Sequence, residues 1–368
     1  MRIILAGGGT AGHINPALAI ANYITEKHPD VEILYIGCKG KMEEKLVTEA
    51  NYKFKGISIS GFSRKFNLEG IEKNLITLGR LVASLRESKK IIAEFKPDIC
   101  IGTGGYVSGP VLRQANKMGI PTIIHEQNAF PGITTKMLSQ KVKCVMLATD
   151  SAKKHLKDGC IIRVTGNPVR KEIIMESKEN ARKRLGIDSR PLVLSFGGSL
   201  GAKKINEAVL ELIKNTAKND QYQHIHAYGG YDTDFIKKLG LKLEDHINLD
   251  IREYIKDMQL CLAAADLVIC RAGAMTLSEL MAQGKPAILI PSPNVTANHQ
   301  YHNAMDMVTN NAASIIEEKN LTGKKLIMEV DRLLKNKEKL NEYSKNSAKM
   351  AILDSTKRIY DIIRKIVQ

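Results

Sequence analysis

The chain alternates short, continuous apolar runs with longer stretches in which apolar residues recur at helical spacing. In the first half, the apolar runs lie in "ILAGGGTAGHINPALAIA", "VEILYIGC", "PDICIGTGGYVSGP" and "IPTIIHEQNAFPG". Strands that are apolar throughout are typical of parallel sheets covered by helices on both faces. The pattern therefore predicts a doubly wound α/β domain over residues 1–163.

The same order of elements returns in the second half without a repeat of the sequence. Its apolar runs lie in "RPLVLSFGGSLGAKKINEAVLELI", "YQHIHAYGG", "HINLDIREYIKDM", "ADLVICRAGAMTLSELMAQGKPAILIP" and "AASIIEE". We expect a second Rossmann-like domain over residues 164–352, followed by a helix at about 353–368 that can pack back on the first domain. Two such domains facing across a cleft would place the carboxyl ends of both sheets, where α/β folds bind ligands, opposite each other.

The loop after the first apolar run carries Gly7, Gly9 and Gly12 in G-x-G-x-x-G spacing. Glycines let the main chain approach a phosphate, and the N–H groups at a helix N-terminus favour an anion. A dinucleotide site usually adds Asp or Glu at the end of the second strand, but this chain has Gly37 and Cys38 there. The loop thus predicts a diphosphate ligand. The missing acidic residue weakens the interpretation as an NAD-dependent oxidoreductase and leaves an NADP-type site open.

Two further loops follow apolar strands and begin helices. The loop in "SFGGSLGAKK" offers Gly198, Ser199 and their main-chain amides to an anion. The segment "CRAGAMTLSEL" begins a helix at residues 274–276 and places Glu279 one turn further on, where a carboxylate can accept both hydroxyls of a ribose. A tight turn and a Glu that stabilises its own helix are the alternatives. Glycine loops at corresponding places in the two halves favour a ligand site.

Composition limits the class of partner. The 55 Lys and Arg against 39 Asp and Glu give a net charge of +16, which favours an anionic membrane surface or a phosphorylated substrate. Aromatic residues make up 5% and Trp is absent, so the stacking platforms of nucleic-acid binders are not evident and we expect no nucleic-acid partner. No two of the six cysteines form a C-x-x-C pair, and no apolar stretch reaches roughly 18 residues. We expect a cytoplasmic protein that can rest on a membrane.

Seven motifs together carry a resemblance to a known family. They are "GGGTAGHINPALA", "GTGGYVSGP", "HEQNAFPG", "GNPVR", "GGSLGA", "CRAGAMTLSEL" and "HQYHNA", in the family's order. In these motifs the chain resembles the bacterial MurG family of peptidoglycan glycosyltransferases, within glycosyltransferase family 28. The resemblance implies a GT-B fold and transfer of N-acetylglucosamine from UDP-N-acetylglucosamine to undecaprenyl-diphosphate-linked N-acetylmuramyl-pentapeptide. It places the enzyme at the cytoplasmic face of the cell membrane, as a peripheral protein without a cofactor.

The resemblance also assigns ligand contacts residue by residue. The main chain of Ile255 reads the uracil, Glu279 binds the ribose, and Ser199 lies near the donor diphosphate with Arg170. Leu200 stands where many members of the family carry Gln. The implied substrate-binding residues are Thr10, Ala11, Gly12, Asn128, Arg170, Gly198, Ser199, Ile255, Ala274, Met275, Thr276, Glu279, Gln300 and Asn303.

Transfer from an α-linked donor with formation of a β linkage is an inverting displacement, which needs a base for the attacking hydroxyl. His13 is the first candidate, because the positive end of its helix disfavours imidazolium and leaves the ring able to accept a proton. An orienting role is the alternative for His13, and Glu126 is the reserve candidate for the base. Arg170 and helix N-termini can stabilise the leaving diphosphate, so no metal is required. His224 and His226 share a strand face without a third ligand, so we expect strand packing there rather than a metal site.

The segment from Gly61 to Lys90 predicts an amphipathic helix in the first half of the chain. Leu75, Leu78, Val82 and Leu85 fall on one helical face. Basic residues surround this face: Arg64, Lys65, Arg80, Arg86, Lys89 and Lys90. The face can dock on an anionic membrane or pack on the protein's own core, and the pattern leaves both open.

Two other functional classes also stay open at this point. Another GT-B enzyme that uses UDP-sugars, such as a lipid glycosyltransferase or a UDP-N-acetylglucosamine 2-epimerase, would carry similar glycine loops. A non-catalytic nucleotide-sugar-binding protein would keep the fold and lack the base, which an intact His13 argues against.

Overall fold

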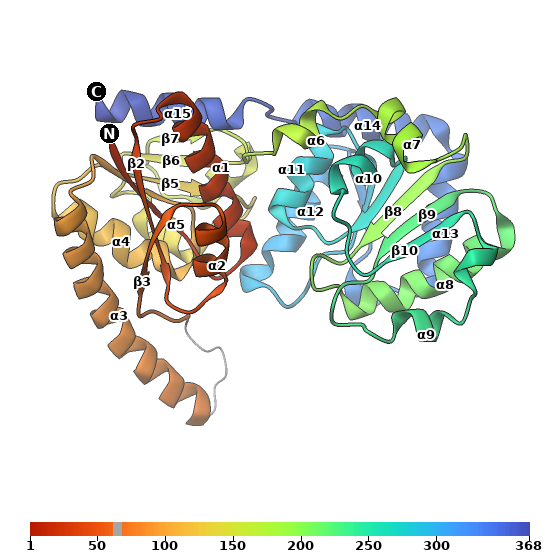
Figure 1. Ribbon diagram of the computed structural model, residues 1–368, viewed down its shortest axis with the longest axis horizontal. Helices are drawn as coiled ribbons and strands as arrows, with labels where there is room; N and C mark the ends of the chain where they lie inside the picture. Colours follow the sequence, from red (N-terminus) through yellow and green to blue (C-terminus); the bar gives the residue numbers. More distant parts are fainter. Residues whose placement is uncertain (62–67) are drawn as a thin grey trace. The chain divides into compact units, whose positions relative to one another are not determined.

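The chain forms two α/β units, each built on its own parallel sheet (Figure 1). The computed structural model describes residues 1–61 and 68–368, and it describes side chains outside residues 62–76. The N-terminal unit comprises Met1–Pro168 together with Asp354–Gln368, and the C-terminal unit comprises Val169–Leu353. Both sheets have doubly wound strand orders, so the predicted pair of Rossmann-like domains is confirmed.

The sheet of the N-terminal unit has the order β3-β2-β1-β4-β5-β6-β7, and all neighbours pair in parallel. The strands are β1 Arg2–Ala6, β2 Glu32–Cys38, β3 Lys53–Ile57, β4 Ile99–Gly102, β5 Thr122–Glu126, β6 Cys144–Leu147 and β7 Ile162–Val164. The helices are α1 Ala11–Lys27, α2 Met42–Glu49, α3 Leu68–Phe95, α4 Gly105–Lys117, α5 Ile133–Leu138 and α15 Ser355–Val367, with a 3-10 turn at Asp150–His155. Strands are added to one side of β1 up to β3 and to its other side from β4 onward. In such sheets ligands bind where the strand order reverses, so we expect them at the carboxyl ends of β1 and β4.

Side chains of β1 alternate between two cores, one on each face of this sheet. Ile4 packs in a core that includes residues of α4, whereas Ile3 packs in a core that includes residues of α1. The second core also receives Ile359 and Ile363 from α15, the last helix of the chain. Figure 1 shows α15 beside α1, so the C-terminus completes the covering of the N-terminal sheet.

The sheet of the C-terminal unit has the order β10-β9-β8-β11-β12-β13, again all parallel. The strands are β8 Leu192–Phe196, β9 Gln223–Ala227, β10 Leu249–Arg252, β11 Leu267–Cys270, β12 Ala287–Leu289 and β13 Ala313–Ile315. The helices are α6 Lys171–Met175, α7 Lys178–Leu185, α8 Lys203–Asn219, α9 Phe235–Leu239, α10 Met258–Ala264, α11 Ala274–Ala282, α12 His299–Thr309, α13 Gly323–Lys335 and α14 Lys337–Met350. Three 3-10 turns, Leu243–Asp245, Thr296–Asn298 and Glu318–Asn320, complete the unit. The strand order reverses between β8 and β11. We therefore expect a ligand beside the loops that follow these two strands.

The two histidines of β9 are completely buried against β8. The Ser195 hydroxyl lies 2.8 Å from His224 Nε2 and 2.8 Å from His226 Nδ1. Burial lowers the pKa of His226 to about 3 and the pKa of His224 well below its usual value, so both rings stay neutral. The described residues contain no cluster of three or more side chains able to hold a metal ion. The pair belongs to the packing between the two strands.

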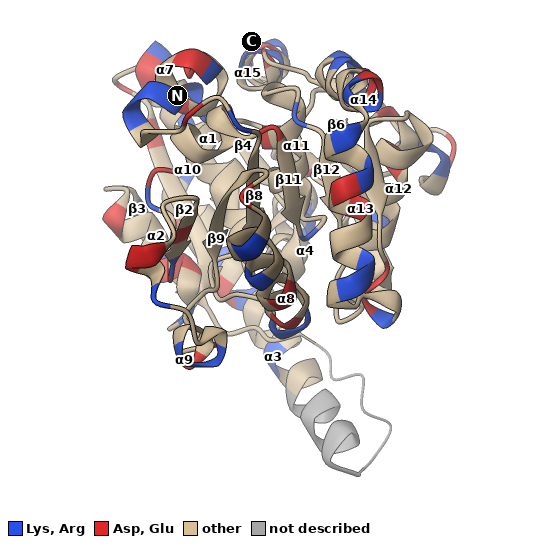
Figure 2. Ribbon diagram, turned by 90° about the vertical axis from the view of Figure 1, so that its right-hand side faces the viewer, with Lys and Arg blue, Asp and Glu red and all other residues tan. Residues whose placement is uncertain are grey.

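Positions occupied by basic residues and by acidic residues are interspersed along α13 in Figure 2. Arg332 pairs with Glu329 across one turn, and Lys339 pairs with Glu342 in the same way on α14. Such pairs keep helix faces solvated and contribute little stability each. Among the described residues, no helix has an apolar stretch long enough to cross a membrane.

Candidate active site

The loop between β1 and α1 lies directly against the loop between β4 and α4. The Thr103 main-chain N–H donates to the carbonyl of Ala6 over 2.9 Å, which continues the pairing of the two strands beyond their ends. A Cβ atom added to Gly105 would lie 2.2 Å from the Gly8 carbonyl oxygen, and Gly105 has a φ of +75°. A side chain cannot be accommodated at that distance, so glycine is required there for the two loops to meet.

The far end of this first glycine loop is exposed at the start of α1. Residues 10–12 are solvent-exposed, and no side chain caps the N-terminus of the helix. Behind the loop, the buried Glu43 carboxylate accepts the main-chain N–H of Cys38 over 3.0 Å and that of Gly9 over 3.5 Å. The uncapped N–H groups and the helix dipole suit the binding of an anionic ligand at Thr10, Ala11 and Gly12.

His13 lies in the first turn of α1, where its ring is held from two sides. Nδ1 lies 3.0 Å from the carbonyl oxygen of Thr103 and 3.0 Å from Oε1 of Gln127. The Thr103 hydroxyl donates to the His13 carbonyl over 2.7 Å. A main-chain carbonyl can only accept, so Nδ1 carries the proton and the neutral ring has its lone pair on Nε2. His13 can therefore accept a proton at Nε2.

Glu126 is an anchor for the loop that leads into α5. Its side chain is buried, and Oε2 accepts the Gly132 main-chain N–H at 2.9 Å and the Thr135 hydroxyl at 2.6 Å. Oε1 accepts the main-chain N–H of Asn128 at 3.1 Å and its side-chain amide at 3.0 Å. A carboxylate with these four donors has little capacity left for a substrate proton. The geometry therefore favours His13 over Glu126 as the base and gives Asn128 a fixed position at the end of β5.

The second glycine loop joins β8 to α8 and again approaches another main-chain segment. The Gly201 N–H donates to the Gly198 carbonyl over 3.0 Å, and a Cβ atom added to Gly201 would lie 2.0 Å from the carbonyl oxygen of Tyr228. This contact leaves Ser199 and Leu200 exposed at the tip of the loop. The tip is accessible to an anionic ligand, as the sequence predicts, although Leu200 adds an apolar surface at this point.

Arg170 and Glu279 form an ion pair within the C-terminal unit. Arg170 precedes α6, Glu279 lies in α11, and Nη2 and Oε1 are 3.5 Å apart. The Glu279 side chain is 19% exposed and that of Arg170 is 56% exposed. Burial raises the pKa of Glu279, and the charge of Arg170 opposes this shift. The pair brings together two residues that lie 109 positions apart in the printed sequence and that the family resemblance assigns to one ligand.

The remaining predicted contacts of the C-terminal unit lie at loops and helix starts. The Ile255 side chain is buried in the core, so only the main chain of its loop can meet a ligand. Ala274, Met275 and Thr276 form the partly exposed first turn of α11, which has no side-chain cap. These positions agree with the binding of a ligand by main-chain groups.

Gln300 and Asn303 lie on α12 and differ in exposure. Gln300 is half-buried, and its Oε1 accepts the Ser292 main-chain N–H over 2.9 Å, which aligns its amide. Asn303 is buried, and its amide donates to the carbonyl of Ala272 over 3.2 Å, just before α11. The resemblance implies that Asn303 binds substrate, and this stays a prediction. The structure shows that its hydrogen bond to Ala272 holds the segment before α11.

Thr103 and Gln127 are not among the residues predicted from the sequence, although both lie inside the motifs that carry the resemblance. The alternation of side chains between the two faces of β5 is the signal that could have identified Gln127. Successive side chains of a strand point to opposite faces of the sheet, so His125 and Gln127 share one face and Glu126 lies on the other. Glu126 therefore cannot act at the same place as His125 and Gln127. The partner of His13 comes from a separate strand, and strand pairing cannot be read from a motif.

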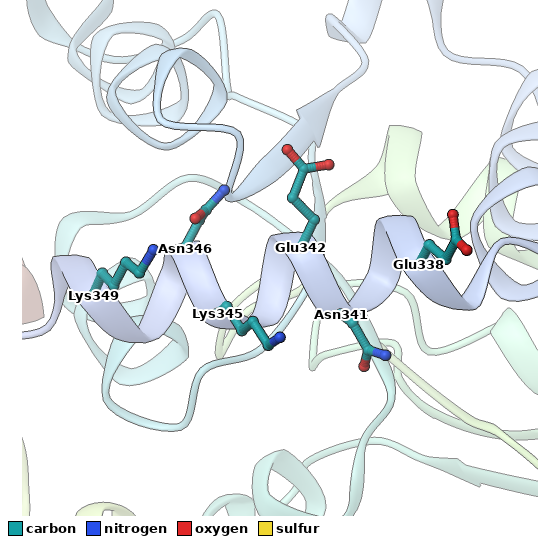
Figure 3. Close-up of a pocket in the computed structure, with 6 residues that line it drawn as sticks. All are labelled: Glu338, Asn341, Glu342, Lys345, Asn346 and Lys349. Atoms are coloured by element: carbon teal, nitrogen blue, oxygen red, sulfur yellow. The ribbon is translucent and has the colours of Figure 1, made fainter.

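A hollow on α14 lies outside these loops (Figure 3). It is lined by Glu338, Asn341, Glu342, Lys345, Asn346 and Lys349, all from the one helix. Ligand sites are usually concave and lined mostly by apolar and aromatic side chains, whereas every residue that lines this hollow is polar or charged. The hollow is a feature of a solvated helix face and not a second active site.

Helix α3 exposes part of its predicted apolar face. Leu78 is 53% exposed and Val82 is 47% exposed, whereas Leu85 is partly buried. Among the side chains of α3 that the structure describes, from residue 77 onward, the exposed basic residues are Arg80, Arg86, Lys89 and Lys90. Leu75, Arg64 and Lys65 lie outside the side chains that the structure describes. The apolar face thus includes two exposed residues one turn apart, and Leu85 contributes less than the pattern predicts.

Comparison with known families also divides the chain into two parts. Residues 3–147 match the glycosyltransferase family 28 N-terminal domain, and residues 192–361 match the glycosyltransferase family 28 C-terminal domain. Two curated relatives carry the name UDP-N-acetylglucosamine--N-acetylmuramyl-(pentapeptide) pyrophosphoryl-undecaprenol N-acetylglucosamine transferase. The protein of Acetivibrio thermocellus is 49% identical, and that of Bacillus subtilis is 39% identical. Both matches cover 100% of this chain and 99% of the relative.

Solved structures support the same assignment of the fold. The structure of Acinetobacter baumannii MurG superimposes with a TM-score of 0.78 at 27% identity, covering 99% of each chain. The UDP-GlcNAc 2-epimerase of Neisseria meningitidis, solved with UDP-GlcNAc bound, superimposes with a TM-score of 0.65 at 15% identity, covering 99% of this chain and all of the other. The second likeness concerns the fold alone.

Proposed function

The chain belongs to glycosyltransferase family 28, and from this premise we propose that it transfers N-acetylglucosamine from UDP-N-acetylglucosamine to undecaprenyl-diphosphate-linked N-acetylmuramyl-pentapeptide. The observation that carries the proposal is the full-length match to relatives named for this transfer. The reaction is a step of peptidoglycan synthesis, and its class is that of an inverting hexosyltransferase with the GT-B fold.

The C-terminal unit supplies the donor contacts in this proposal. The Glu279 carboxylate accepts the ribose hydroxyls, and the main chain around Ile255 reads the uracil. Arg170, Ser199 and the N–H groups at the starts of α8 and α11 face the diphosphate. The Arg170–Glu279 ion pair and the exposed tip of the second glycine loop support this arrangement. Fixed donors and positive charge at this position would stabilise the negative charge that develops on the leaving UDP.

The N-terminal unit supplies the base. The acceptor 4-hydroxyl oxygen attacks C1 of N-acetylglucosamine on the side opposite the diphosphate, as the bond between C1 and the diphosphate oxygen breaks. The electron pair of that bond leaves with UDP, and His13 Nε2 takes the hydroxyl proton. The single displacement converts the α linkage into a β linkage through an oxocarbenium-like transition state. Gln300 and Asn128 contact the transferred sugar, and residues 10–12 bind the acceptor phosphate.

The proposed reaction is tested by UDP release from UDP-N-acetylglucosamine with and without a lipid-linked N-acetylmuramyl-pentapeptide. We expect release only with the acceptor, and a β linkage in the product. A matched acceptor analogue without the 4-hydroxyl should give no release. Turnover of UDP-N-acetylglucosamine alone would identify an epimerase, and binding without turnover under either condition would identify a non-catalytic nucleotide-sugar-binding protein.

The substitution Glu279→Gln tests the donor contact. Loss of the charge should remove a charge-assisted hydrogen bond worth about 1.5–3 kcal/mol, which weakens UDP-N-acetylglucosamine binding about 10- to 150-fold. Calorimetric titration of the donor measures the change in Kd. The control is Glu329→Gln, because Glu329 also pairs with an arginine and its side chain is 20% exposed, close to the 19% of Glu279. Equal donor affinity in both variants would remove Glu279 from the donor site.

We further propose that α3 docks the protein on the cytoplasmic face of the membrane. The exposed Leu78 and Val82 lie one turn apart, and exposed basic residues of the same helix would lie near lipid phosphates. Burial of apolar side chains in the interface and attraction to anionic lipids act together in such helices. The lipid-linked acceptor gives the enzyme a reason to bind at that surface.

The double substitution Leu78→Ser and Val82→Ser should weaken binding to vesicles containing phosphatidylglycerol by at least about tenfold, because two apolar side chains no longer enter the interface. Vesicle co-sedimentation measures the change, and activity on a water-soluble acceptor analogue should persist. The matched control replaces Ile133 and Met137 with Ser, since these residues are also one turn apart and are 67% and 70% exposed. Unchanged binding of the α3 variant, or an equal loss in the control, would contradict docking through α3.

A further inference from the structure

A chain of hydrogen bonds continues behind His13 into the interior of the N-terminal unit. The Gly166 carbonyl oxygen lies 2.9 Å from His125 Nε2, and Gln127 Nε2 lies 2.9 Å from His125 Nδ1. Gln127 Oε1 lies 3.0 Å from Nδ1 of His13. His125 is completely buried and Gln127 is 3% exposed. The four residues come from α1, from the end of β5 and from the segment after β7.

Main-chain carbonyl groups fix which atom donates in every hydrogen bond of this series. The Gly166 carbonyl accepts, so the His125 proton is on Nε2, and burial lowers the pKa of His125 and keeps its ring neutral. The lone pair of His125 is then on Nδ1, and the Gln127 amide N–H donates to it. The same Gln127 nitrogen also donates to the His125 carbonyl over 3.1 Å, which excludes the flipped orientation of the amide.

With the amide in this orientation, Gln127 presents its oxygen to His13. The Gln127 oxygen and the Thr103 carbonyl both accept the hydrogen on His13 Nδ1, each over 3.0 Å. The only ring nitrogen of His13 left with a lone pair is Nε2. Asn167 adds a further constraint, because its side-chain amide donates to the Gln127 carbonyl over 3.1 Å.

We propose that Gln127, oriented by His125, is a positioning residue that holds His13 in the tautomer with Nε2 as the proton acceptor. This inference rests on the proposed role of His13 as the base. The amide does not titrate and the series ends at the Gly166 carbonyl, so the proton taken from the acceptor hydroxyl stays on His13 Nε2 until solvent removes it. Gln127 therefore orients His13 without supplying the negative charge that a carboxylate would place there.

Long-range ¹H–¹⁵N spectra of protein labelled at its nine histidines test the hydrogen-bond series directly. We expect neutral His13 to be protonated on Nδ1 and His125 on Nε2, the opposite tautomer, with signals assigned from His13→Gln and His125→Gln variants. A wild-type His13 protonated on Nε2 in its neutral form would overturn the proposal. This measurement needs no enzymatic turnover, so it separates a failure of the positioning series from a failure of the proposed transferase activity.

The substitution Gln127→Met tests whether the positioning matters for the reaction. It keeps the side-chain volume and removes the three side-chain hydrogen bonds to His13 and His125. Only the Thr103 carbonyl then holds His13 Nδ1, so the His13 nitrogen shifts should move part of the way towards averaged values. We expect kcat to fall about ten- to hundredfold, the cost typical of losing the partner that orients a functional histidine. The KM for UDP-N-acetylglucosamine should stay within about twofold, because the proposed contacts to its nucleotide and diphosphate lie in the other unit.

The matched control is Thr122→Val, a buried change in the same strand. The Thr122 hydroxyl donates to Asn116 Oδ1 over 2.6 Å and does not touch His13, Gln127 or His125. It should lower the thermal stability as a lost buried hydrogen bond does, and leave both kcat and the His13 shifts unchanged. A Gln127→Met enzyme with wild-type kcat would overturn the positioning role. If that variant does not fold, the wild-type tautomers decide the question.

Discussion

Direct contact between main-chain segments at the carboxyl edge of each sheet is the constraint on which the candidate functional residues of each unit depend. Gly8 and Gly105 meet in the N-terminal unit, and Gly201 meets the carbonyl of Tyr228 in the C-terminal unit, at distances that no Cβ atom allows. Because the loops lie this close, the helices that follow them begin directly at the sheet edge. Their N–H groups and first-turn side chains then share one small region of each unit.

Three buried or largely buried carboxylates show how the same residue type takes different roles. Glu126 accepts four hydrogen bonds and Glu43 holds the first glycine loop by main-chain N–H groups. Glu279 pairs with Arg170, which is more than half exposed, and burial raises its pKa. The anchored carboxylates order the protein, whereas the carboxylate with hydrogen-bonding capacity left is the one suited to a ligand.

The sequence predicted the two doubly wound units because continuous apolar strands and glycine loops are local patterns. It also located the glycine loop that carries Ser199 and the two helices that carry His13 and Glu279. It did not identify Gln127 as the partner of His13, since that contact depends on which strands are neighbours in the sheet. The burial of Asn303 and the partial burial of Leu85 depend likewise on packing by distant segments, which the periodicity of a single helix does not reveal.

The proposed reaction depends on removal of the acceptor proton by His13, and the His13→Gln variant tests this step. Gln preserves hydrogen-bonding capacity without basicity, so only proton transfer is removed. We expect kcat to fall about 10²- to 10⁴-fold, the range typical of the loss of a general base, with an unchanged Kd for UDP-N-acetylglucosamine. A His13→Gln enzyme whose kcat stays within about threefold of wild type would contradict it, because general-base catalysis contributes far more than that.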